Sequence, residues 1–202
     1  MKLYYSPGAC SLSPHIVLRE AGLDVDLVKT DLKAHKLGDG TDYYGIHSKG
    51  YVPLLELDNG ERLGEGPAIV QYIADQHPEK KLAPANGTMA RYRLQEWLNF
   101  ITSELHKGMG TMFNPAMPED AKVVARARAT GRLKWLDEQL EGKQYLMGDT
   151  FSVADAYLFT VAGWAKHVGL DISALSHLGA FLGRVSARPA VQAAMKAEGL
   201  IK

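Results

Sequence analysis

The chain of 202 residues contains a single cysteine, Cys10. One thiol cannot form an internal disulfide, and Ser13 occupies the position at which a CxxC pair would have its second cysteine. We therefore expect a protein of a reducing compartment, the cytoplasm. The N-terminal residues lack the charged segment, apolar run and cleavage site of a secretion signal, so none is expected.

The sequence also lacks an excess of charge of either sign. Its 23 lysines and arginines balance 23 aspartates and glutamates, whereas a nucleic-acid-binding protein normally carries a basic surplus. No apolar run reaches the roughly 18 residues that a membrane span needs. The histidines show neither HExxH nor another metal-ligand spacing. We expect no nucleic-acid partner, no membrane partner and no metal.

Strand and helix signals alternate over residues 1–80. The expected elements are a strand over 2–6, a helix over 12–21, a strand over 25–30, a weakly helical glycine-rich stretch over 36–50, strands over 54–57 and 61–63, and a helix over 68–76. Gly22 ends the first helix. The turn Asp58-Asn59-Gly60 predicts a hairpin, and Pro67 suits the first turn of a helix.

The second half of the chain shows helical signals only. Helices are expected over 89–109, 119–140, 152–168, 178–187 and 189–197. A polar stretch with two prolines precedes them. The sequence therefore predicts a small α/β domain over residues 1–80, a linker over 81–87 and an all-α domain over 88–202.

One helix start in this second half has a clear local signal. Ser152 and Asp155 have the spacing of a capping box, with Asp in place of the usual Glu or Gln. The apolar residues that follow predict a central helix. We interpret this pair as structural.

Cys10 stands between the expected first strand and first helix. A thiol at a helix N-terminus lies near unpaired N–H groups, whose partial positive charge lowers a thiol pKa and favours bound anionic sulfur. The alternative is a buried, inert cysteine. Position alone leaves both interpretations open.

Two further segments of residues 1–80 offer main-chain groups to a ligand. Pro53, just before a strand, is either an ordinary trans proline or a cis proline that turns the N–H and C=O of Val52 toward a peptide. Glu65 and Gly66 precede a helix, where the carboxylate and the N–H would suit the ammonium and carboxylate of an α-amino acid. Alternatively, Glu65 only complements the helix dipole.

The helix expected over 89–109 has two distinct faces. An apolar stripe predicts the core: Leu94, Leu98, Ile101, Leu105 and Met109. Asn99, Ser103 and His106 share another face, which is polar but carries no Lys–Glu pairs. This face is either the wall of a polar crevice or a set of satisfied structural residues.

These segments, in this order, resemble the cytosolic glutathione S-transferases, and among them the bacterial beta class. The stretches that carry the resemblance are YYSPGACSLSPHIVLRE, GYVPLLELDNG, LGEGPAIVQYIADQ, EWLNFITSELHKG and FSVADAYLFTVAGWA. The resemblance implies a thioredoxin-like α/β N-terminal domain followed by an all-α C-terminal domain. It also implies glutathione as co-substrate, a small hydrophobic electrophile, and a homodimer.

The resemblance implies these glutathione-binding residues: Cys10, His35, Val52, Pro53, Glu65, Gly66, Asn99, Ser103, Glu104, Leu105, His106 and Lys107. Cys10 and His106 would be catalytic by stabilising the glutathione thiolate, with Tyr5 as the alternative donor. Ser103 and Glu104 are the candidates for contacting glutathione across a dimer interface. His35, followed by Lys36, stands where the class often has a lysine for the glycine end of glutathione.

The residues expected to shape the electrophile pocket are apolar: Ala9, Met109, Met112, Phe113 and Trp164. They do not identify an electrophile. Two other functions remain open. Cys10 would permit a thiol reductase or reductive dehalogenase that works through a mixed disulfide with glutathione. A non-catalytic binding module is the remaining alternative.

Overall fold

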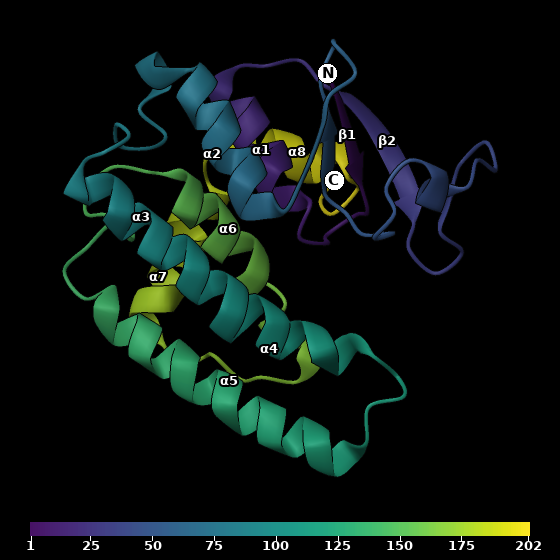
Figure 1. Ribbon diagram of the computed structural model, residues 1–202. Coiled ribbons are helices and arrows are strands. Elements are labelled where there is room, and N and C mark those ends of the chain that lie inside the picture. The colour runs from purple at the N-terminus through teal and green to yellow at the C-terminus, as the bar shows by residue number, and fades with distance from the viewer. The chain divides into compact units, whose positions relative to one another are not determined.

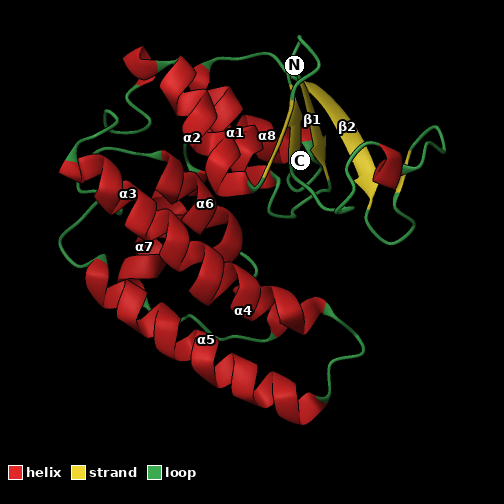
Figure 2. Ribbon diagram, viewed as in Figure 1, coloured by secondary structure: helices red, strands yellow, loops and turns green.

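The computed structural model describes all residues from Met1 to Lys202 and forms two compact units. The first unit comprises Met1–Ala83 together with Arg188–Lys202, and the second comprises Pro84–Ala187. All strands lie in the first unit, whereas the second is helical (Figure 2). The expected division of the chain therefore differs at its C-terminus, because residues that the sequence assigned to the helical domain pack within the first unit.

The first unit is built on a five-stranded sheet with the order β3-β2-β1-β4-β5. Its strands are β1 (Lys2–Tyr5), β2 (Asp26–Asp31), β3 (Lys36–Leu37), β4 (Leu54–Glu56) and β5 (Arg62–Gly64). β1 is parallel to β2 and antiparallel to β4. The parallel pair requires a crossover, which α1 supplies, whereas a tight turn joins β4 and β5 as the Asp-Asn-Gly signal predicted.

Three helices belong to this unit: α1 (Leu12–Ala21), α2 (Gly66–Gln76) and α8 (Pro189–Ala197). α1 contacts both α2 and α8 (Figure 1). Its apolar residues Ile16, Val17 and Leu18 are fully buried. α8 has the expected bounds, but its partner is α1, which explains why the chain after residue 187 belongs to the first unit.

The segment between β2 and β4 was expected to be weakly helical and instead contains a short strand. β3 pairs antiparallel with β2, and a 3-10 turn at Tyr43–Gly45 follows. The side chain of Asp42 accepts a hydrogen bond from the Tyr44 N–H at 3.0 Å and caps that turn. Pairing with the edge of the sheet therefore prevailed over the weak local helix signal.

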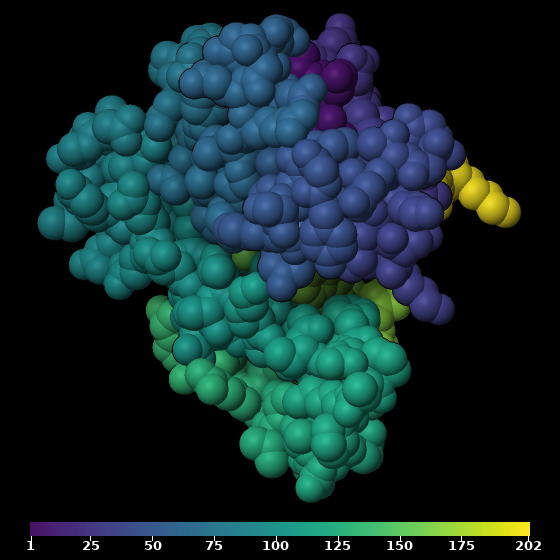
Figure 3. All heavy atoms as spheres, turned by 45° about the vertical axis from the view of Figure 1, so that its right-hand side comes forward, coloured from purple at the N-terminus to yellow at the C-terminus, as the bar shows by residue number.

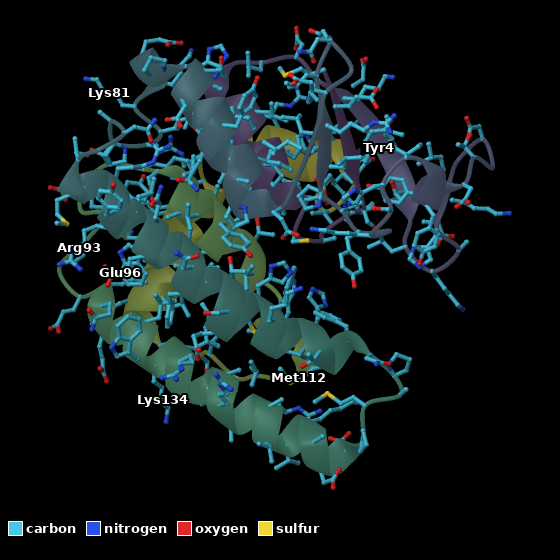
Figure 4. All side chains as sticks on the ribbon, viewed as in Figure 1. Tyr4, Lys81, Arg93, Glu96, Met112 and Lys134 are labelled. Carbon is cyan, nitrogen blue, oxygen red and sulfur yellow. The ribbon has the colours of Figure 1, made fainter.

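The second unit contains α3 (Met89–Phe100), α4 (Lys107–Gly110), α5 (Glu119–Gln139), α6 (Val153–Ala162) and α7 (Ser176–Ser186). The predicted apolar stripe of its first helix is buried throughout. Figure 4 shows Arg93 and Glu96 on α3, where they form a salt bridge at 2.8 Å. None of the helices in the structure is both long and apolar enough to cross a membrane.

The helix expected over 89–109 is interrupted by a π-helical segment, Ile101–His106, between α3 and α4. The helix expected over 152–168 ends at Ala162, and a 3-10 segment at Ala165–Val168 follows. Periodicity alone does not distinguish these variants from a continuous α-helix.

The capping box at the start of α6 is present, and its carboxylate is fully buried. The N–H and the hydroxyl of Ser152 both donate to Asp155 Oδ2 at 2.8 Å. The Leu146 N–H donates to Oδ1 at 2.8 Å. Burial raises the pKa of Asp155 to about 6, although these hydrogen bonds oppose the shift. Asp155 therefore joins the loop before α6 to the first turn of that helix.

Candidate functional site

The loop between β1 and α1 carries Cys10 and is held by short-range hydrogen bonds. Ala9 N–H donates to the Ser6 carbonyl at 3.0 Å. The Ser11 hydroxyl accepts from the Ser6 N–H at 3.1 Å and donates to the Ser6 carbonyl at 3.2 Å. Ser11 thus closes the loop, and its side chain does not cap α1. The loop presents Cys10 directly before the first turn of the helix.

The thiol of Cys10 lies against the loop that precedes β4. Its Sγ donates to the carbonyl oxygen of Val52 at 3.1 Å, and the Cys10 side chain is partly exposed. The Val52–Pro53 peptide bond is cis, one of the two alternatives that the sequence left open. The structure therefore brings together Cys10 and Val52, two residues separated by 42 positions in the sequence.

The main chain before Pro53 rests on a buried tyrosine. The Tyr43 hydroxyl donates to the Tyr51 carbonyl at 2.9 Å. Val52 packs in a cluster with Tyr4, Tyr43 and Leu54. This packing fixes the peptide edge at Val52 from the side of the core.

Glu65 and Gly66 form the start of α2, as predicted. Glu65 has φ +64°, an uncommon backbone conformation for a residue other than glycine, and such outliers concentrate at functional sites. Its carbonyl accepts the N–H groups of Ala68 and Ile69 at 3.0 Å. A Cβ added at Gly66 would lie 3.9 Å from Pro53 Cγ, so this helix end adjoins the cis-proline loop.

The carboxylate of Glu65 already has a cationic neighbour, which no local pattern in the sequence indicates. Lys49 Nζ lies 2.7 Å from Glu65 Oε1, and both side chains are more than half exposed. A ligand ammonium at Glu65 would therefore share the carboxylate with Lys49.

His35 lies in the segment that joins β2 to the 3-10 turn, again with a positive φ, of 51°. Its ring packs against Tyr44 with a centroid distance of 4.5 Å, and Nδ1 is buried without a hydrogen-bond partner. Only glycine fits at the neighbouring Gly50, where a Cβ would lie 2.6 Å from Tyr44 and 2.8 Å from His35. Lys36 is exposed at the start of β3.

In the second unit, His106 is held by the central helix. His106 Nδ1 lies 2.6 Å from the hydroxyl of Tyr157 on α6. The ring also packs edge-on against Trp164, 5.0 Å between centroids. Tyr157 was missed because its helix reads as uniformly apolar. A tyrosine in such a helix is itself a signal, because a buried hydroxyl needs a partner.

The π-helical segment Ile101–His106 contains side chains that bond back to the main chain. The Thr102 hydroxyl donates to the Leu98 carbonyl at 2.8 Å, and the Ser103 hydroxyl donates to the Asn99 carbonyl at 3.0 Å. Each acceptor lies four residues earlier in the chain. Of the remaining predicted residues, Asn99, Ser103 and Lys107 are exposed, and Leu105 is fully buried.

Glu104 is bound within its own unit. Arg132 Nε and Arg128 Nη2 lie 2.7 and 3.1 Å from Glu104 Oε2, and hydrogen bonds from both arginines hold its pKa below the ordinary value. The resemblance implied a contact between this carboxylate and glutathione, and any such contact would share the carboxylate with two arginines of α5.

The residues expected to shape an electrophile pocket differ in exposure. Met109, Met112 and Trp164 are buried, whereas Phe113 is 49% exposed. Phe113 packs edge-on against Trp164, 5.7 Å between centroids. Trp164 thus lies between His106 and Phe113 in a row of rings. No group of three or more His, Cys, Asp and Glu side chains is placed to hold a metal ion.

Comparison with known proteins supports one family over the whole chain. Residues 1–75 match the family model of the N-terminal domain of glutathione S-transferase, and residues 100–189 match that of its C-terminal domain. The glutathione S-transferase GstA of Escherichia coli O157:H7 is 47% identical over 200 residues, which cover 99% of this chain and all of the relative.

Two solved structures show the same architecture. A sphingomonad glutathione S-transferase complexed with glutathione has a TM-score of 0.95 at 49% identity, and each chain is covered completely. A beta class glutathione S-transferase of Sphingomonas chungbukensis has a TM-score of 0.96 at 50% identity, again with complete coverage of both chains. The chain therefore belongs to the glutathione S-transferase family, in its bacterial beta class, and is an enzyme of that family.

Proposed function

We propose that this glutathione S-transferase conjugates the glutathione thiolate to small hydrophobic electrophiles, with its sulfur bound beside Cys10. The observation that supports this most is the continuity of the candidate groups in the first unit. Cys10 is hydrogen-bonded to Val52, the cis proline follows, and the start of α2 at Glu65 and Gly66 adjoins that proline. These groups suit the thiol, peptide and amino-acid parts of one tripeptide.

Each part of glutathione would have its own contact in this proposal. The Val52 main chain would pair with the cysteinyl peptide like an added strand. Glu65 and the Gly66 N–H would bind the ammonium and carboxylate of the γ-glutamyl group. His35 or Lys36 would approach the glycine carboxylate. The residues of the second unit that belong to the proposal are Asn99, Ser103, Glu104, Leu105, His106 and Lys107.

Catalysis requires that glutathione be a thiolate. A thiol with a pKa of about 8.5 is only about 3% ionised at pH 7, and lowering the pKa by two units requires ~2.7 kcal/mol of preferential stabilisation. The helix end after Cys10 would supply up to ~2 kcal/mol. A hydrogen bond from the Cys10 N–H or from His106 would supply the remainder. Tyr5 is buried and its pKa is raised by that burial and by Glu198, so it stays protonated.

The test is the pH profile of kcat/KM with 1-chloro-2,4-dinitrobenzene in Cys10→Ala and His106→Ala. If these residues stabilise the thiolate, the profile moves to higher pH in at least one variant. An unshifted profile in both variants would refute their role while leaving glutathione binding intact.

A second activity is favoured by the partly exposed thiol of Cys10. In a reductase, the Cys10 thiolate would attack a glutathionylated substrate, form a mixed disulfide with glutathione and release the substrate thiol; a second glutathione would then regenerate Cys10 and leave as oxidised glutathione. Replacing Cys10 by serine separates the two activities. Reduction would be lost and conjugation retained if both proceed as proposed.

We further propose a cytoplasmic homodimer, as family membership suggests, with Ser103 exposed for contact with a partner subunit. Analytical ultracentrifugation at micromolar concentration tests the assembly. A mass of 22.1 kDa, that of one chain, would contradict it.

A further inference from the structure

The C-terminal segment of the chain is anchored on α1 in the first unit. α8 packs along α1, and Arg188 binds Glu20 through Nε and Nη2 at 2.6 and 2.8 Å. The last two residues are exposed, and they lie at the yellow C-terminal end of the chain in Figure 3. Glu198, three residues before Ile201, is 6% exposed. A glutamate buried so close to a chain terminus needs a structural explanation, because burying a carboxylate is costly unless it is hydrogen-bonded.

Glu198 uses its two oxygens on two different elements. Oε1 lies 2.8 Å from Nδ1 of His15, which is fully buried within α1. Oε2 accepts the N–H of Gly8 at 2.9 Å. Oε1 and Nδ1 form a hydrogen-bonded pair in which the tautomer of the His15 ring decides which atom donates. Glu198 therefore links α1 to the loop that carries Cys10.

The loop has a matching shape at this contact. Gly8 adopts φ +69°, and a Cβ added there would lie 3.4 Å from the Leu200 side chain. Ser11 closes the loop onto Ser6 at its base, two residues before Gly8. The loop is thus fixed at its base by Ser11 and at its tip by Glu198, with Cys10 two residues beyond the tip.

We propose that Glu198 is a positioning residue for the sulfur site: by accepting the Gly8 N–H, it sets the loop in which the Cys10 thiol reaches Val52. His15 holds Glu198 in the orientation that this contact needs. Losing one partner of a buried hydrogen bond costs the desolvation of the group left behind, so the contact between the Gly8 N–H and Glu198 can hold a short loop in place. This inference rests on the proposed function for its catalytic meaning, but not for its test.

The test is the rate at which iodoacetamide alkylates Cys10, followed by mass spectrometry. Cys10 is the only cysteine, so the rate reports this site alone. In Glu198→Ala, loss of the contact to Gly8 frees the loop and raises the rate about tenfold. Glu198→Gln retains an oxygen for the Gly8 N–H, and its amide N–H can donate to His15 Nδ1 when the ring carries its proton on Nε2. Its alkylation rate therefore stays within about twofold of the wild type.

Arg188→Ala is the matched control, because it removes the other polar anchor of the C-terminal segment on α1 without touching the loop. It lowers the melting temperature but leaves the alkylation rate within about twofold of the wild type. All rates are measured at a temperature at which circular dichroism shows every variant to be folded. Equal acceleration in Glu198→Ala and Arg188→Ala, or no acceleration in Glu198→Ala, overturns the proposal.

Glutathione affinity supplies an independent readout by calorimetry. Glu198→Ala binds glutathione more weakly, and Glu198→Gln and Arg188→Ala bind it as the wild type does. If the wild type bound no glutathione, the proposed function would fail, whereas the alkylation rates would still decide the role of Glu198.

Discussion

At the scale of single residues, the candidate site depends on polar groups whose partners lie far away in the sequence. The sequence indicated Cys10 and Glu65 because each precedes the start of a helix. It indicated His106 because this residue lies on a polar helix face. It did not indicate the partners Lys49 and Tyr157. Lys49 lies in an irregular stretch and Tyr157 in an apolar helix, so no local pattern indicates that they contact Glu65 and His106.

Lys49 competes with a ligand ammonium for Glu65, so removing it should tighten glutathione binding. In Lys49→Met the dissociation constant falls up to about fivefold, since an exposed pair contributes under ~1 kcal/mol. Isothermal titration calorimetry measures this, with Lys33→Met as a control that removes an exposed charge away from Glu65. Weaker binding in Lys49→Met would instead assign Lys49 to the ligand carboxylate.

The hydrogen bond between His106 and Tyr157 should matter for turnover. Tyr157→Phe removes the hydroxyl 2.6 Å from His106 Nδ1 and lowers kcat/KM about fivefold, the effect of one hydrogen bond. Because both residues act through the same bond, Tyr157→Phe causes no further loss in a His106→Ala background. Additive losses in the double variant would show that Tyr157 acts independently of His106.

At the scale of elements, the sequence predicted regular pieces well and irregular ones poorly. α1, α8 and the β4–β5 hairpin have the expected positions because the glycine after α1, the proline at the start of α8 and the turn residues of the hairpin are local signals. β3 was missed because its two residues are strand only through pairing with β2. The π segment was missed because it is defined by hydrogen bonds rather than by composition.

The cap of α6 should make stability depend on pH through Asp155. Its ordinary pKa of 3.8 is raised to about 6 in the folded protein. The folded state therefore holds the proton more tightly than the unfolded state. This contribution is fully present below pH ~4 and is lost as the pH rises through ~6, which amounts to ~3 kcal/mol.

Urea unfolding of the wild type and of Asp155→Asn at pH 4 and pH 7 measures this dependence. The asparagine variant does not titrate, and it is less stable overall because an amide cannot accept all three hydrogen bonds. The advantage of the wild type over the variant should shrink from pH 4 to pH 7. An advantage that grows with pH would show that the hydrogen bonds outweigh burial.

At the scale of the whole molecule, the chain returns to its first unit at the end. Sequence patterns predicted α8 as a helix but gave no sign of its partner, because its apolar face would suit either unit. Its contacts with α1 show that the first unit is not complete without the last residues.

Two buried valines test this division. Val191 on α8 and Val185 on α7 are both fully buried, so each change to alanine costs about 2 kcal/mol. By hydrogen exchange, Val191→Ala should lower the protection of α1 and β1, whereas Val185→Ala should lower that of the second unit's helices. Loss of protection in α1 for both variants, or for Val185→Ala alone, would contradict the assignment of α8.

The central claim is that the first unit binds glutathione as a thiolate beside Cys10. The most direct measurement is the pH titration of the thiolate absorbance of bound glutathione, taken as the difference between protein with and without the ligand. A free thiol has a pKa of about 8.5. We predict that the bound thiol has an apparent pKa about two units lower. A bound thiol that ionises at the same pH as free glutathione would contradict the account.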